Sequence, residues 1–264
     1  MKNYIVNKNA KVKTNDGYVL ENQSIINAIN FCNDAISNLY EMNIKFNINI
    51  FEILGMRNLS GFVGEYFSKS VAINSNDDLT SNMHQDGYPD LLLINTTEKK
   101  EYLKKLYIEE NGKKYPISKE LFSPFKYGGI EIKATCGSTP SASANYSKPL
   151  IGERRINDLK SFDWKAHHRQ TNNLLAVLWD FIDEIPTIVA CFYSNNLTTD
   201  DWGKIVQPKE DGGRTTSVSI MGRTGIRKMC DGWIAVIDDP DYINALSQEK
   251  WIGNELKEQK DANN

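Results

Sequence analysis

Two short segments hold the residue types best suited to metal-assisted chemistry: Pro89-Asp90 and, 41 positions after the aspartate, Glu131-Ile132-Lys133. Hydrolysis of a phosphodiester needs a hard cation that neutralises the developing charge and prepares a water molecule as nucleophile. Mg²⁺ prefers oxygen ligands, and one or two carboxylates together with phosphate oxygens are enough to bind it. Asp90 and Glu131 could supply these carboxylates if the fold brings them together.

Both segments lie in sequence that is typical of strands. Residues 91–94 form a short apolar run between Pro89 and a polar cluster at 95–97, which predicts a buried strand. Residues 130–135 alternate, with Ile130, Ile132 and Ala134 on one face and Glu131, Lys133 and Thr135 on the other. Lys133 therefore shares a face with Glu131, where its ammonium group could orient the attacking water or help to deprotonate it.

The pattern alone is not specific. An acid followed two positions later by lysine also occurs at 98–100, 158–160, 163–165, 255–257 and 258–260, and Pro-Asp recurs at 240–241. Only Glu131 lies in a strand-like alternation, and only Asp90 opens an apolar strand upstream of such an alternation. The alternative is a solvated charge pair on an edge strand and an unrelated aspartate in a turn.

The remaining elements are read from apolar spacing and from turn residues. We expect helices over 24–42, 58–71 and 162–185, a charged surface helix or extension over 98–107, a hairpin turn at 111–112, and strands over 187–194, 215–221 and 232–238. Pro186 would end the long helix, and a glycine-containing connection at 222–225 would join the last two strands. This order predicts a mixed α/β protein with a central mixed sheet flanked by helices.

With Pro89-Asp90 and Glu131-Ile132-Lys133 in this context, the chain resembles the PD-(D/E)XK nucleases, and among them the type II restriction endonucleases. The resemblance covers residues of about 57–194 and implies a core of helix, three strands, helix and strand. It further implies a Mg²⁺-dependent enzyme that hydrolyses double-stranded DNA at a short specific sequence. Asp90, Glu131 and the carbonyl of Ile132 would then bind the metal, and Lys133 would act on the water.

Two details of the resemblance concern the surroundings of this motif. Many members of the family place a glutamate on the helix before the first strand, and Glu65 fits that position, although a surface charge is the alternative. The 40 residues between the two motif halves exceed many family spacings, and an inserted hairpin around Asn111-Gly112 would explain the difference.

Candidate DNA contacts come from basic and amide side chains, which bind phosphates and read base edges. Residues 125–169 contain eight basic and four acidic residues, so this segment is positive although the whole chain has a net charge of −3. The candidates are Arg154, Arg155, Arg169, Asn172, Arg214, Arg223, Arg227 and Lys228. The alternative is a polar helix start and a surface loop.

The 264 residues suit a single catalytic domain over 1–264, with regions 1–56 and 195–264 left for DNA recognition or dimer contacts. Four well-separated cysteines and the lack of a signal or membrane-spanning segment favour a cytoplasmic protein with reduced thiols. We expect a homodimer because two-fold DNA sites are cut most simply by one active site per strand. The apolar stripe from Ile25 to Tyr40 is a candidate interface.

Two other functions stay open at this point. A structure-specific or repair nuclease of the same superfamily would need little base recognition. A DNA-binding protein without catalysis would not need the intact Glu131-Ile132-Lys133 segment.

Overall fold

The computed structural model describes residues 2–84, 86–167, 169–207 and 217–262. Its main sheet contains β1 (Tyr4–Val6), β4 (Leu79–Ser81), β5 (Leu91–Leu93), β8 (Gly129–Thr135), β10 (Leu174–Ile182), β11 (Ile185–Ser194) and β13 (Trp233–Ile237). These strands lie in the order β1-β13-β11-β10-β8-β5-β4. Neighbours are antiparallel except for β8 and β10, which are parallel. The mixed α/β class predicted from the sequence is therefore correct.

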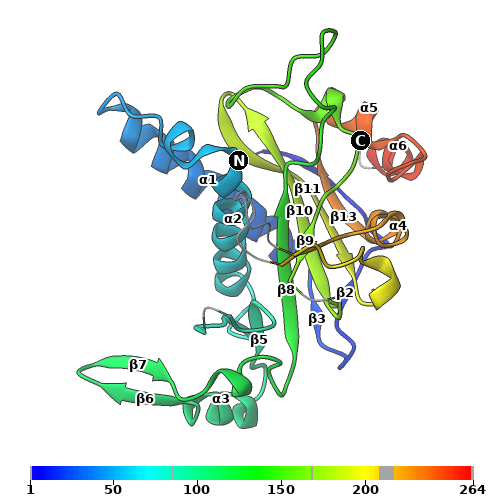
Figure 1. The fold of residues 1–264 in the computed structure, drawn as a ribbon. Helices are drawn as coiled ribbons and strands as arrows, with labels where there is room; N and C mark the ends of the chain where they lie inside the picture. Colours follow the sequence, from blue (N-terminus) through cyan, green and yellow to red (C-terminus); the bar gives the residue numbers. More distant parts are fainter. Residues whose placement is uncertain (1, 85, 168, 208–216, 263–264) are drawn as a thin grey trace.

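Helices cover both faces of this sheet (Figure 1). On one face lie α1 (Asn22–Ile44) and α2 (Ile50–Ile73), and on the other lie α4 (Arg223–Asp231), α5 (Pro240–Leu246) and α6 (Glu255–Asp261). The helices predicted at 24–42 and 58–71 are confirmed as α1 and α2. The second is longer than predicted because α2 begins before a kink at Gly55, whose φ of 65° is not helical.

The predicted helix over 162–185 is wrong. Residues 174–182 form β10, which pairs with β8 on one side and with β11 on the other. All nine residues of β10 are buried, because alternate side chains enter the apolar cores on the two faces of the sheet. Such a continuous apolar run cannot be distinguished from a buried helix by periodicity alone. Asp183 and Glu184, both with positive φ, form the tight turn to β11, and Pro186 lies inside that strand.

The C-terminal part also differs from the prediction. Residues 222–225 are not a connecting loop, because α4 begins at Arg223 and separates the last two predicted strands. The strand predicted at 215–221 is reduced, within the described residues, to β12 (Ser219–Ile220), which pairs with β9 (Lys165–Ala166). The strands predicted at 187–194 and 232–238 are confirmed within β11 and β13.

The connections carry the smaller elements. A short N-terminal hairpin is formed by β2 (Val12–Lys13) and β3 (Val19–Leu20), and single 3₁₀ turns occur at η1 (Lys119–Leu121), η2 (Ile156–Asp158) and η3 (Thr199–Asp201). Residues 136–173 cross from β8 to the parallel strand β10 with only η2 and β9 as regular elements among their described residues.

A separate lobe is inserted between β5 and β8, which are neighbours in the sheet. It consists of α3 (Thr97–Lys104), η1 and the hairpin of β6 (Tyr107–Glu110) and β7 (Lys113–Pro116), and it projects from the body of the protein (Figure 1). Asn111 and Gly112 form the predicted turn, with φ of 52° and 72°. The inserted hairpin therefore accounts for the long spacing between Asp90 and Glu131.

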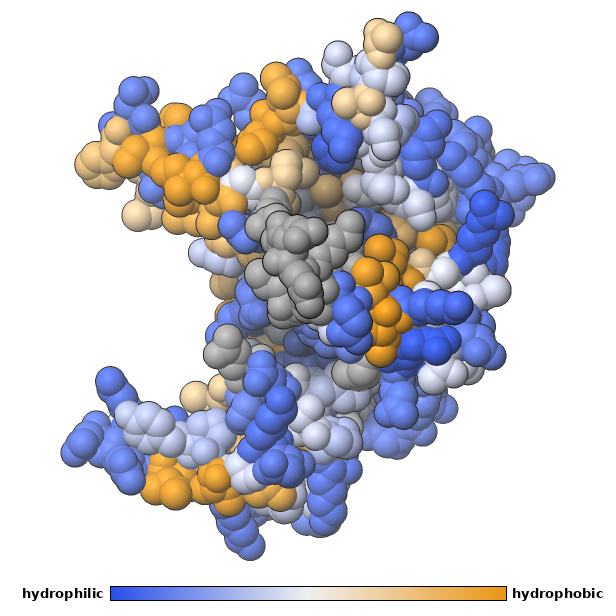
Figure 2. Space-filling view, in the orientation of Figure 1, coloured by the Kyte–Doolittle hydropathy of each residue, from blue (hydrophilic) through white to orange (hydrophobic). Residues whose placement is uncertain are grey.

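The expected dimer stripe on α1 is not available as an interface. Ile25, Ile29, Cys32 and Ile36 are fully buried against the protein's own sheet. Exposed apolar side chains lie instead where α1 turns into α2, a surface that we call the apolar tip: Met42 (62% exposed), Ile44 (44%), Phe46 (78%), Ile48 (40%) and Ile53 (69%). Figure 2 shows hydrophobic side chains gathered at this end of the helix pair. Across the described ranges, no helix combines the length and apolarity needed to cross a membrane.

Candidate active site

Strand register brings Asp90 and Glu131 together. In the antiparallel pair of β5 and β8, Leu91 lies opposite Ile130, so the residue before β5 lies next to Glu131. The backbone N–H of Asp90 donates to Glu131 Oε2 at 3.1 Å, and the N–H of Ile132 donates to Asp90 Oδ2 at 2.8 Å. The expected proximity of the two acids is therefore observed.

Gly129 makes this close pairing possible. A Cβ atom at this position would lie 1.9 Å from the carbonyl oxygen of Leu91, and the φ of 148° is one that other residues rarely adopt. A side chain here would push β5 away from β8. The glycine before the alternating strand is thus required for the contact between Asp90 and Glu131.

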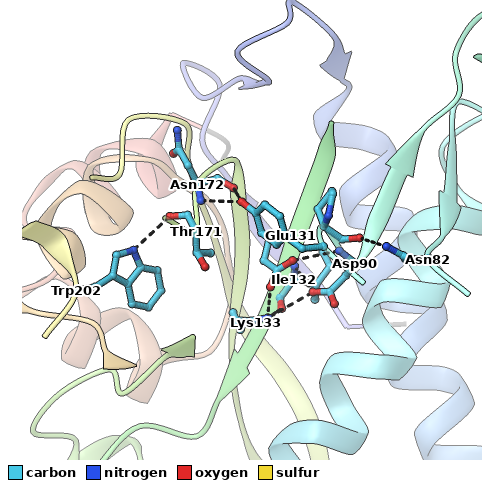
Figure 3. A network of polar contacts seen from close by, with 10 residues as sticks. Asn82, Asp90, Glu131, Ile132, Lys133, Thr171, Asn172 and Trp202 are labelled. Carbon is cyan, nitrogen blue, oxygen red and sulfur yellow. Dashed lines mark hydrogen bonds and ion pairs between the residues drawn. The ribbon is translucent and has the colours of Figure 1, made fainter. Parts of the chain in front are cut away.

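Lys133 places its ammonium group among the oxygens of this cluster (Figure 3). Its Nζ lies 2.5 Å from Glu131 Oε1, 2.9 Å from the carbonyl oxygen of Ile132 and 3.5 Å from Asp90 Oδ2. These three oxygens are the ones that the sequence resemblance assigns to the metal. They converge on one position, which in this structure is taken by a cationic nitrogen.

Burial controls the electrostatics of the cluster. The side chain of Glu131 is only 8% exposed, and this burial, reinforced by the charge of Asp90, raises the pKa of Glu131 to about 7. Burial alone would lower the pKa of Lys133, but Glu131 and Asp90 outweigh it and raise that pKa above its ordinary value. Lys133 is therefore an ammonium ion, which has no lone pair with which to accept a proton from a water molecule.

The donor set fits a hard divalent cation. Two carboxylates and one backbone carbonyl face a common position, and Mg²⁺ commonly completes such a partial shell with water and substrate oxygens. With all three side chains ionised, the charges of Asp90, Glu131 and Lys133 add to −1, which favours a cation. Within the described part of the chain, no three His, Cys, Asp or Glu side chains lie close enough to hold a metal by themselves. A metal ion bound between Asp90 and Glu131 would therefore take the carbonyl of Ile132 as its third protein ligand.

Glu65 lies near this site but does not join the cluster. It is an exposed residue of α2 and lines a cavity of about 360 Å³ that Asp90 also borders. Ser68, Lys69, Ser81 and His84 contribute to the same walls. Glu65 therefore shares a cavity with Asp90, as its predicted place near the site requires. It does not add a third carboxylate at the position where Asp90 and Glu131 meet.

Asn82 was missed by the sequence analysis, although it holds the loop that carries Asp90. Its side-chain amide donates to the carbonyls of Pro89 and Phe122, each at 3.0 Å, and its backbone N–H donates to the Asp90 carbonyl at 2.8 Å. A Cβ on Gly87 would lie 2.2 Å from this amide, so a glycine is needed there. No local pattern identifies such a residue, since asparagine is common in any turn-rich segment.

Tyr88 links the same loop to the segment before β10. Its hydroxyl group donates to the carbonyl of Asn172 at 3.3 Å and accepts from the Asn172 N–H at 3.2 Å (Figure 3). The Asn172 side chain donates to the Asn195 carbonyl at 2.9 Å and accepts from the Leu197 N–H at 3.0 Å. Asn172, a predicted DNA contact, is therefore engaged in joining two loops.

Several predicted DNA contacts also bind other parts of the protein. Arg154 pairs with Asp239 and Asp241, Arg169 donates to the carbonyls of Thr199 and Trp202, Arg227 pairs with Asp231, and Lys228 pairs with Asp201 at 2.6 Å. Arg155 donates to Thr139 at 3.4 Å. Asp231 lies one helical turn from Arg227, but the other partners come close only in the folded chain, so the sequence could not identify them.

Two candidates remain. Arg223 is an exposed residue at the start of α4 and is not engaged by any residue in the described ranges. Arg214 lies outside the described residues.

Arg169 and Asn172 occupy the irregular segment before β10, rather than the front of a long helix.

Comparison with family models finds no match, and comparisons with curated proteins and with solved structures find no significant match either. A functional assignment for this chain therefore depends on the geometry of the site.

Proposed function

We propose that the protein is a Mg²⁺-dependent endonuclease of the PD-(D/E)XK type that cleaves double-stranded DNA at a short specific sequence. One observation carries the proposal: the oxygens of Asp90, Glu131 and Ile132 converge on a single position, which a cationic nitrogen occupies. Strand pairing places the Ile132 carbonyl, and backbone N–H groups hold one oxygen of each carboxylate, which favours a preorganised cation site.

The order of elements supports the proposal. Helix α2 is followed by β4, β5 and β8, which form an antiparallel series, and then by β10, which is parallel to β8. This is the helix-and-three-strand order of the family with its fourth strand. The departure is the crossover over 136–173, whose described residues form no α-helix where the family has one.

Each residue then has a separate role. Asp90 and Glu131 would hold Mg²⁺ with the Ile132 carbonyl, and bound Mg²⁺ would supply the positive charge that stabilises phosphodiester hydrolysis. Lys133 would hold a water molecule by a hydrogen bond from its ammonium group. Asn82 and Tyr88 would keep the Asp90 loop in place against β8 and the segment before β10.

The test is incubation of purified protein with genomic DNA of high sequence complexity, with and without Mg²⁺, followed by sequencing of the fragment ends. We expect Mg²⁺-dependent fragments whose ends share a short sequence. Fragment ends without a shared sequence would favour a structure-specific or repair nuclease. Intact DNA under all conditions would refute the nuclease proposal and favour a non-catalytic DNA-binding protein.

We further propose that the protein is a homodimer that associates through the apolar tip. Its five side chains expose on the order of 500 Å² of apolar surface, which is in the upper part of the range for the largest apolar patch of a monomer, and such patches often bind a partner. About 60% of the area of a protein interface is apolar, so an apolar patch of this size corresponds to an interface of about 800 Å² per partner. That is the area of a standard interface. Residues 42–53 contain only Lys45 and Glu52 as charges, so two copies can meet without repulsion. Sedimentation should show a dimer for the native chain and a monomer for Phe46→Asp.

A further inference from the structure

The wall of the cavity beside Asp90 contains a cationic side chain, Lys69, that has no role in the proposed chemistry. It lies between α2 and the segment 81–90, and Glu65 and Lys69 reach it from the same face of α2, because they are four positions apart. Lys69 is exposed, and it forms no ion pair with any residue in the described ranges. Its ammonium group is therefore available to a ligand.

This availability distinguishes Lys69 from most of the basic residues expected to contact DNA. Arg154, Arg227 and Lys228 each bind an acid of the protein itself. Lys69 instead borders the same cavity as Asp90, a residue of the candidate metal site. A cation that is both unpaired and adjacent to the candidate metal ligands is well placed to bind the substrate.

Neutral donors accompany Lys69 in the cavity walls. His84 accepts a hydrogen bond at Nδ1 from the Asp86 N–H at 3.2 Å, so in the neutral ring the proton is on Nε2, which can donate. Ser68 adds a hydroxyl group. An ammonium group, an imidazole N–H and a hydroxyl are together the donors that a phosphate oxygen accepts from in proteins.

The acidic side chains of the cavity oppose the binding of an anion. Glu65 and Asp90 would repel a phosphate, and Lys69 balances only one of these charges. A divalent cation held by Asp90 and Glu131 would remove the remaining excess of negative charge. The phosphate and the metal ion should therefore bind together.

We propose that this cavity binds the DNA phosphate next to the phosphodiester that is cleaved, with Lys69 as its ionic contact and His84 as a hydrogen-bond donor. The inference rests on the proposed nuclease function and adds the residues that bind the substrate backbone. Lys69 acts here on a group that does not react, so it contributes to binding in the ground state and in the transition state alike.

The test uses a duplex containing the cleavage site identified by fragment-end sequencing. Lys69→Ala should raise KM roughly tenfold with kcat nearly unchanged, as expected for the loss of uniform binding. Binding is measured separately with Mg²⁺ in the Lys133→Met background, which prevents turnover. There, adding Lys69→Ala should reduce the slope of log K against log salt by about one. The matched control is Lys257→Ala, an exposed lysine of α6 on the other face of the sheet.

The outcomes separate the two proposals. Cleavage by the native protein with KM and salt slope unchanged in Lys69→Ala would overturn the phosphate site and leave the nuclease function standing. A fall in Mg²⁺ affinity for Glu65→Gln, with DNA binding unaffected by Lys69→Ala, would show that the cavity holds a second cation instead. Absence of cleavage by the native protein would overturn both proposals.

Discussion

Replacement of Lys133 by methionine tests the electrostatic reading of the site most directly. The change removes the ammonium group and keeps an unbranched apolar side chain in its place. Two carboxylates, 8% and 35% exposed, then face each other without a cation. Breaking a fully buried ion pair costs about 3–5 kcal/mol, and the partial exposure of Asp90 and of Lys133 reduces this, so we expect a loss of about 2 kcal/mol in metal-free buffer.

Mg²⁺ should reverse this loss. In the native protein a metal ion must displace the Lys133 Nζ from the three oxygens, whereas in the variant those oxygens have no competing cation. A ligand at 100 times its Kd adds about 2.7 kcal/mol to the free energy of unfolding, so saturating Mg²⁺ should restore at least the native stability. DNA cleavage should stay absent, because no group is left to hold the water.

Urea unfolding of both proteins, with and without Mg²⁺, measures these changes. Lys257→Met, on an exposed face of α6, is the control and should unfold like the native protein in both buffers. The reasoning is refuted if Lys133→Met is as stable as the native protein without metal. It is also refuted if Mg²⁺ shifts the midpoint of the native protein more than that of the variant.

Four other variants separate catalysis, folding and DNA contact. Asp90→Ala should abolish cleavage while gel-shift assays show retained DNA binding; turnover by this variant would contradict the metal assignment. Although burial alone would raise the pKa of Asp201, hydrogen bonds from Lys228 and from a backbone N–H hold it below its ordinary value. Its stabilisation is thus present above about pH 4 and lost as pH falls through the lower folded pKa. In urea unfolding, the free energy of unfolding of Asp201→Asn should therefore be lower than that of the native protein by about 2 kcal/mol at pH 7, and it should change less toward pH 3. Arg223→Ala should weaken DNA binding by about 1–3 kcal/mol without loss of stability if it reads a base, whereas Arg227→Ala should lose about 1–2 kcal/mol of stability; a purely structural effect of both would exclude Arg223 as a DNA contact.

The fold was predicted well where the local pattern has one physical meaning. The stripe of α1 and the alternation of β8 each indicate a single element, because only one period places the apolar side chains on one face. Asn111-Gly112 likewise predicts a hairpin, since both residues accept positive φ.

Prediction failed where burial is complete. The run at 174–182 is apolar on both faces because the sheet is covered on both sides, and this removes the period that separates strand from helix. The turn at Asp183 and Glu184 that would have corrected the assignment lacks the glycine or asparagine that usually marks such turns.

The candidate site shows the same division. The residue types and the strand character of their segments follow from the amino-acid sequence, because carboxylates bind hard cations and alternate positions share a face of a strand. Residue type and spacing are therefore enough to group Asp90, Glu131 and Lys133 as one candidate site.

Which of the charges are free to act follows from the folded chain. Folding pairs β5 with β8 so that Asp90 contacts Glu131, engages Arg154 and Lys228 with acids distant in the chain, and leaves Lys69 at the cavity. The physical reason is that an ion pair depends on distance in space, which the fold sets, whereas the sequence specifies only the charge of each residue.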